Sequence, residues 1–184
     1  MISLLPKRKI STFTGDAMDW THLIAAFKDL VHDNVRSDSQ RLSILRGLLS
    51  PEVRSEIGNA LTSPDMYWTV LSELEENYGH PHLVARAYMD DLLSTAAVSE
   101  NDRAGLVHFI RKVRGAVKIL QFNGYGSELK SGVALGQLVA KLPKSIQSRW
   151  GRYSYDKLPR IVTILDLERW LHKIAMREKM VSNV

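Results

Sequence analysis

The stretch that decides the fold is residues 13–20, which read Phe-Thr-Gly-Asp-Ala-Met-Asp-Trp. It combines a turn with a helix start. Gly15 permits a backbone conformation that most residues resist, and Asp16 or Asp19 can cap the first amides of a helix. The aromatic residues at the two ends of the block can anchor the turn. Because none of these side chains is equipped for catalysis, the block predicts a packing element.

Apolar residues recur at helical spacing in the chain that follows this block. The first helix should cover residues 19–33, with Trp20 and Phe27 on one stripe. Two similar helix starts come next, Ser50-Pro51-Glu52 and Ser63-Pro64-Asp65. Each offers a capping hydroxyl, a proline at the first helical position and an acid in the first turn. These patterns predict an all-α fold of about nine helices.

The same periodicity predicts the second part of the chain and its division into two lobes. Only residues 8–14 look extended, and Tyr153 to Pro159 should form a loop. The boundary between the lobes falls between residues 79 and 101, which gives one lobe over residues 1–80 with an N-terminal arm and another over residues 81–184. The later helices are expected at 82–94, 102–121, 128–141, a short segment opened by Pro143, and 163–179.

The composition is that of a globular, intracellular protein. The chain has 184 residues, of which 45% are hydrophobic and 24% are charged. No apolar run approaches the roughly 20 residues that span a bilayer. The basic cluster Lys7-Arg8-Lys9 follows the short apolar start, which is the reverse of a secretory signal. Because there is no cysteine, disulfides and thiolate chemistry are excluded. We therefore expect a cytoplasmic location.

Charge is unevenly distributed between the two parts of the sequence. Residues 1–88 hold nine Lys or Arg against eleven Asp or Glu, a net charge of −2, whereas residues 89–184 hold sixteen against nine, a net charge of +7. This asymmetry indicates two surfaces with different partners. The basic part is either a solvated face or a face that attracts a polyanion such as RNA.

The last forty residues carry the strongest nucleic-acid signal. Tyr153 and Tyr155 interleave with basic residues, as in many proteins that bind single strands. No helix-turn-helix, zinc-finger or RNA-binding sheet motif is present, so only non-specific attraction to phosphate is predicted. The candidate RNA-facing residues are Arg149, Arg152, Lys157, Arg160, Lys173, Arg177 and Lys179.

Motifs for catalysis, metals and cofactors are scarce. His80-Pro81-His82 has no third ligand at a zinc-binding spacing and is interpreted as a helix stop with exposed imidazoles. The neighbours Glu75-Glu76 and Asp90-Asp91 point about 100° apart on a helix, so they do not form a carboxylate dyad. Residues 124–127 lack the lysine of a phosphate-binding loop. The sequence therefore predicts no enzyme, no metal site and no cofactor.

An ordered set of segments resembles the Gag capsid-like region of BEL/Pao-type LTR retrotransposons. The resemblance starts with Leu5-Pro6-Lys7, the block 13–20 and Phe27, continues through the helix 39–49, and includes the aromatic-glycine pair Tyr78-Gly79. It covers roughly residues 4–150.

The sequence also departs from this family. It lacks the family's aromatic near Leu23, its glycine near Pro51 and its histidine near Tyr88. No Cys-Cys-His-Cys knuckle, protease or polymerase is present. The resemblance is therefore to a capsid region alone, either excised or domesticated.

The resemblance implies a structural protein of two small helical lobes, similar to the N- and C-terminal domains of retroviral capsid. Such a chain self-associates into virus-like shells that package RNA. The first lobe would form hexameric and pentameric rings, and the second would form dimers between rings. The segment 99–114 is similar in placement to the major homology region. The packing residues expected to define the lobes are Phe13, Gly15, Trp20, Phe27, Tyr78, Gly79, Leu106 and Phe109.

Several aromatic residues and the arm carry specific expectations. Trp150 could lie in the core or form an assembly contact between subunits. The arm, residues 4–14, should be pinned either against its own lobe or against a neighbour's. The aromatic residues expected in the core are Trp20, Phe27, Trp68, Phe109 and Trp170.

Two alternative functions stay open. One is a Gag-derived adaptor that dimerises or binds peptides, and the other is a non-specific RNA-binding protein.

Overall fold

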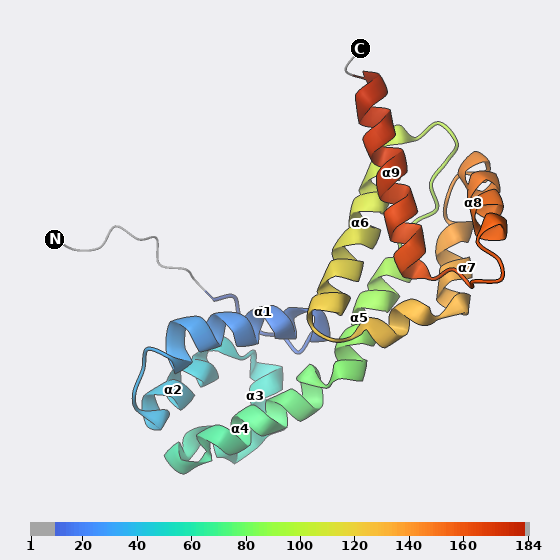
Figure 1. Ribbon diagram of the computed structural model, residues 1–184. Coiled ribbons are helices and arrows are strands. Elements are labelled where there is room, and N and C mark those ends of the chain that lie inside the picture. The colour runs from blue at the N-terminus through green and yellow to red at the C-terminus, as the bar shows by residue number, and fades with distance from the viewer. Residues whose placement is uncertain (1–9, 183–184) are drawn as a thin grey trace. The chain divides into compact units, whose positions relative to one another are not determined.

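The computed structural model describes residues 10–182, and the chain in this range is built from helices (Figure 1). The predicted all-α fold is confirmed. Nine α helices lie within the described range. They are α1 (Ala17–Phe27), α2 (Asp38–Leu48), α3 (Pro51–Ile57), α4 (Tyr67–Leu74), α5 (Pro81–Leu93), α6 (Arg103–Phe122), α7 (Gly132–Ala140), α8 (Lys144–Asp156) and α9 (Ile164–Ser182).

Short turns of other helical types extend or connect these helices. A π-helical turn, Lys28–His32, continues α1, and another, Glu75–Gly79, continues α4. Single 3₁₀ turns lie at Gly58–Thr62, Pro64–Met66 and Gly126–Lys130. In the part of the chain that the structure describes, no helix is both long and apolar enough to cross a membrane.

The chain divides into two compact units between Val84 and Ala85, within α5. We call these unit 1 and unit 2 and describe each by itself. Their identification with the two lobes of a capsid protein stays a prediction.

Residues 13–20 are attached to the rest of unit 1 by backbone hydrogen bonds and by packing of aromatic rings. The Phe13 amide donates to the Leu48 carbonyl at 2.7 Å, and the Phe13 carbonyl accepts from the Ser50 amide at 2.9 Å. The Phe13 ring is only 2% exposed and meets the rings of Trp20 and Tyr78 edge to face. The C-terminal end of the predicted arm is therefore held by its own unit. Residues 4–9 of the arm, with the basic cluster at 7–9, lie outside the described residues.

Two glycines let this aromatic cluster close. Gly15 has a φ of 95°, a left-handed conformation that side chains with a Cβ rarely adopt. Gly79 is buried, and a Cβ at this position would overlap the indole of Trp20. The side chain of Asp16 then accepts from the Met18 amide at 2.9 Å and caps α1. Gly15 and Gly79 thus leave room for the packed rings, and Asp16 fixes the start of the helix that carries Trp20.

The two Ser-Pro-acid starts behave differently. Ser50 is buried, and its hydroxyl accepts from the Val53 amide at 3.3 Å, so it caps α3 as expected from the sequence. Ser63 makes no side-chain cap, and the segment after it forms the 3₁₀ turn Pro64–Met66 before α4 begins. The expectation of a second, equivalent α-helix start was therefore wrong.

Trp68 corrects the predicted core of unit 1, because its side chain is 59% exposed. The buried stripe of α4 consists of Tyr67, Val70 and Leu74. Neighbouring residues on a helix point about 100° apart, so Trp68 is turned out of the stripe that Tyr67 occupies. The Trp68 ring instead lies against the rings of Tyr67 and His32 on the surface. Phe27, by contrast, is 1% exposed.

Unit 2 is organised around the packing of α6 against α9 (Figure 1). The two helices run antiparallel, because Arg103 at the start of α6 pairs with Glu178 near the end of α9, whereas Arg114 pairs with Glu168. The buried face of α6 includes Phe109, which is fully buried. The buried apolar residues of α9 are Ile164, Leu167, Leu171 and Ile174.

Helix α8 corrects one sequence-based expectation and bears on another. The predicted loop from Tyr153 to Pro159 was wrong in its first half, because α8 continues to Asp156. No glycine or proline interrupts residues 152–156, so nothing stops the helix before this point. Trp150, for which the sequence left a core position and an assembly contact open, is 5% exposed within unit 2. It stacks on Tyr153 and meets the half-buried ring of Trp170 edge to face.

The predicted helix over 128–141 is also divided. Residues 126–130 form a 3₁₀ turn, and the hydroxyl of Ser131 then caps α7 by accepting from the Ala134 amide at 3.2 Å. A serine followed by glycine favours such a restart over a continuous helix.

Candidate functional site

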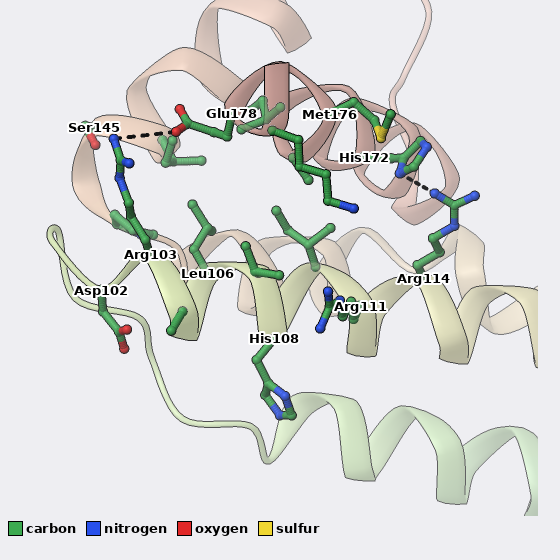
Figure 2. Close-up of a pocket in the computed structure, with 18 of the residues that line it drawn as sticks. Asp102, Arg103, Leu106, His108, Arg111, Arg114, Ser145, His172, Met176 and Glu178 are labelled. Carbon is green, nitrogen blue, oxygen red and sulfur yellow. Dashed lines mark hydrogen bonds and ion pairs between the residues drawn. The ribbon is translucent and has the colours of Figure 1, made fainter. Parts of the chain in front are cut away.

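A hollow of about 1070 Å³ opens between the first half of α6 and the last half of α9, with the start of α8 at one end (Figure 2). The lining is supplied by residues far apart in the sequence: the segment before α6, the helix α6 itself, the α7–α8 connection, the first half of α8, and α9. Every part of this hollow belongs to unit 2.

The floor of the hollow is apolar. On α6 it includes Leu106 and Ile110, which lie one helical turn apart, and across from them α9 contributes Ile174 and Met176. Ile110 and Ile174 are almost fully buried, whereas Met176 is 41% exposed. Leu106, predicted as a packing residue, is half-buried and faces this hollow (Figure 2). A partner would therefore meet apolar side chains that its own apolar groups could cover.

The acidic residues at the edge already have partners. Glu100 accepts from the amide and hydroxyl of Ser145 at 2.9 and 2.7 Å, and these bonds lower the pKa of Glu100. Asp102 accepts from the Gly105 amide at 2.8 Å and caps α6. Glu178 lies 3.7 Å from Arg103 (Figure 2). Each acidic side chain at the edge of the hollow thus already has a partner within the chain.

Five Lys or Arg residues line the hollow, and three of them, unlike the acidic residues, have side chains without partners among the described residues. Arg111 on α6, Arg149 on α8 and Lys179 on α9 are exposed. None of their three side chains has a hydrogen bond, ion pair or ring contact with another residue between 10 and 182. The other two cations, Arg103 and Arg114, are paired with acids. The uncompensated charge at the edge is therefore positive.

The predicted RNA-facing residues come from α8, the connection after it and α9, and they differ in their surroundings. Arg149 and Lys179 line the hollow. The Lys157 ammonium lies 5.1 Å from the centre of the Tyr153 ring, and Arg160 is bound to Asp166. The remaining three, Arg152, Lys173 and Arg177, are exposed on α8 and α9.

Arg160 has a structural role in the connection before α9. Its guanidinium donates to both oxygens of Asp166 at 3.0 and 3.1 Å, and the Thr163 amide donates to the same carboxylate at 2.8 Å. Asp166 is only 7% exposed, and its burial alone would raise its pKa. The hydrogen bonds from Thr163 and Arg160 outweigh this burial, so the pKa of Asp166 is lowered from its ordinary value of 3.8.

Asp166→Asn should remove an acid-dependent part of the stability of unit 2. Because the folded pKa of Asp166 lies below its unfolded value, ionised Asp166 stabilises the fold above pH 3.8, and this contribution is lost as the pH falls through the folded pKa. The substitution should cost about 1–3 kcal/mol at neutral pH. Urea denaturation from pH 2 to 7 measures the effect. Equal pH profiles for both proteins would contradict this role.

The histidine pair noted in the sequence lies at the start of α5, with His80 directly before the helix and His82 in its first turn. The rings of His80 and His82 stack with centroids 5.4 Å apart, and the His82 amide donates to Nδ1 of His80. Among residues 10–182, no group of three or more His, Asp or Glu side chains is placed to hold a metal ion.

Sequence reasoning missed the hollow because it depends on how α6 and α9 pack. The available signal was local: Leu106 and Ile110 belong to the apolar stripe of α6, and Arg103, Arg111 and Arg114 flank it. That pattern alone does not distinguish a fully covered stripe from one that stays partly open.

Comparisons with known proteins give one match. The model of a family described as a protein of unknown function (DUF1759) matches residues 13–158, from Phe13 in unit 1 to just past the end of α8 in unit 2. No curated protein and no solved structure matches the chain.

Proposed function

This chain belongs to the DUF1759 family, and from that premise we propose that it is a Gag capsid-like structural protein that self-associates and packages RNA. The resemblance of its segments to BEL/Pao-type Gag supports the assignment, and the all-helical fold is compatible with it. The same proposal gives the chain no catalytic role and a cytoplasmic location, within particles when assembled.

The observation that carries self-association is three exposed apolar side chains at the end of α8 and in the connection to α9, which we call the apolar patch. Tyr155, Leu158 and Ile161 are 75%, 60% and 81% exposed, although they lie within seven residues of one another. Single apolar residues on a surface are normal, but a cluster of this kind is typical of surfaces that another protein covers. The patch therefore supports an interface between copies of this chain.

The patch can be tested with a double variant. Leu158→Ser with Ile161→Ser should leave the fold intact, because both side chains are largely exposed. The variant should weaken self-association in sedimentation velocity measured over a range of protein concentrations. Val133→Ser is the matched control, since Val133 is 74% exposed on α7, elsewhere in unit 2. Unchanged association of the double variant would place the interface elsewhere.

Non-specific attraction to phosphate supports the RNA-packaging part of the proposal. Arg149, Arg152 and Lys157 are exposed on and directly after α8, and none of them pairs with an acid of the described chain. Each cation that contacts a phosphate releases a counterion, so its removal should reduce both affinity and salt dependence.

Changing these three residues to Gln should weaken binding to single-stranded RNA and make the negative slope of log K against log salt shallower by about 2. Fluorescence anisotropy with a labelled oligonucleotide at several salt concentrations measures both. The matched control changes Lys28, Arg36 and Arg46 to Gln, which removes the same charge from exposed positions of unit 1. Equal losses in the two triple variants would indicate that only net charge matters.

A further inference from the structure

We propose that the hollow between α6 and α9 is a docking groove for an acidic amphipathic helix of another protein. This inference goes beyond self-association and RNA packaging and does not depend on either. Three properties of the hollow support it: its size, its apolar floor and the sign of its free charges.

The size and shape favour a peptide segment. A hollow of about 1070 Å³ is at the upper end of the range of about 300–1,000 Å³ that is typical of ligand pockets, so it has room for several side chains of a peptide. It is bounded by two antiparallel helices, so it runs between them as a trough (Figure 2). A helix laid into such a trough can place apolar side chains at i, i+3, i+4 and i+7 on the floor.

The floor matches that requirement. Leu106 presents apolar surface from one side, above the buried Ile110, and Met176 presents it from the other. Methionine is flexible and polarizable, which suits a surface that must fit another side chain closely. Because Met176 is 41% exposed and Leu106 is half-buried, part of this apolar surface remains to be covered.

The charges select an acidic partner. Glu100, Asp102 and Glu178 are engaged with Ser145, the Gly105 amide and Arg103, so their charges are compensated within the fold. Arg111, Arg149 and Lys179 come from three different helices and lack partners among the described residues. A helix with acidic residues beside its apolar face would pair with these cations while it covers the floor.

Other occupants fit less well. The N-terminal segment of this chain carries Lys7, Arg8 and Lys9, whose charge has the same sign as the free cations. Single-stranded RNA would match the charge, but an apolar floor between the cations offers the phosphate backbone nothing. A second copy of this chain is kept as an outcome of the test.

The probe is a fluorescein-labelled synthetic peptide of 14 residues, with Leu at positions 3, 6, 7 and 10 and Glu beside them. One control peptide has the same composition with the Leu residues scattered around the helix, and another has Lys in place of Glu. Anisotropy titration with the full chain should show micromolar binding of the acidic amphipathic peptide and at least about tenfold weaker binding of both controls. Equal binding of the three peptides, or no binding, would overturn the proposal.

Charge reversal locates the site. Arg111→Glu with Lys179→Glu should weaken binding of the acidic peptide by about tenfold or more and favour the Lys peptide. The matched control is Lys118→Glu with Arg169→Glu, which makes the same change at exposed positions of α6 and α9 outside the hollow. Circular dichroism checks that both variants fold. Equal losses in the two variants would overturn the assignment to this groove.

Light scattering of the same variants without peptide separates this proposal from self-association. If Arg111→Glu with Lys179→Glu changes the oligomeric state while the wild-type chain binds no peptide, the occupant is a second copy and the proposed partner is wrong. If the wild-type chain stays monomeric but binds the acidic peptide at this groove, the docking proposal stands and the capsid-like function fails.

Discussion

Gly79→Ala is expected to destabilise unit 1 by about 3 kcal/mol or more, because the added methyl group would overlap the buried indole of Trp20. Trp20 has little freedom to move, since its ring packs against Phe13, which is itself fixed by backbone hydrogen bonds to Leu48 and Ser50. The expected result is a lower urea midpoint, or loss of unit 1 altogether, in denaturation followed by circular dichroism.

Gly47→Ala is the matched control for this substitution. Gly47 lies in α2 of the same unit, and a Cβ added there would meet no atom within 4 Å. Alanine has a higher helix propensity than glycine by up to about 1 kcal/mol, so this variant should be neutral or slightly more stable. If Gly79→Ala were as stable as Gly47→Ala, the close packing of Trp20 on Gly79 would be wrong.

Trp150→Ala should cost about 3–5 kcal/mol of the stability of unit 2. The Trp150 side chain is 5% exposed, and it joins α8 to α9 through the rings of Tyr153 and Trp170. Its removal would leave a cavity where the two helices meet. Far-UV circular dichroism should show loss of helix or a strongly lowered melting temperature.

Tyr155→Ala provides the comparison within the same helix. Tyr155 is 75% exposed, so its truncation should change the melting temperature little. A Trp150→Ala protein that stays fully folded but no longer associates would restore Trp150 to the assembly contact that the sequence alone left open.

Local features of the fold could be predicted from the sequence where a residue type strongly prefers one structural position, such as the N-cap of a helix. Asp16 and Ser50 cap helices from positions that their side chains and neighbours indicate. The all-α class follows from apolar spacing, because few segments alternate with a period of two. Such features depend on interactions over three or four residues, which a sequence shows directly.

Other features depend on contacts that the sequence does not show. Trp68 has the composition of a core residue, but the phase of α4 is fixed by Tyr67, which takes the buried stripe. Arg160 looks like a free cation in the sequence, yet Asp166 binds it. The hollow depends on the spacing between α6 and α9, and so Leu106 could be assigned to packing but not to an open groove.

The central claim is that this chain is a self-associating, capsid-like protein, and imaging of the purified chain tests it most directly. Negative-stain electron microscopy, with particle mass measured by light scattering, should be performed at increasing protein and salt concentration. Salt should promote assembly, because it screens the repulsion between segments that each carry sixteen basic and nine acidic residues over positions 89–184. We predict closed particles or large oligomers at high concentration. A chain that stays monomeric under all of these conditions would contradict the proposed function.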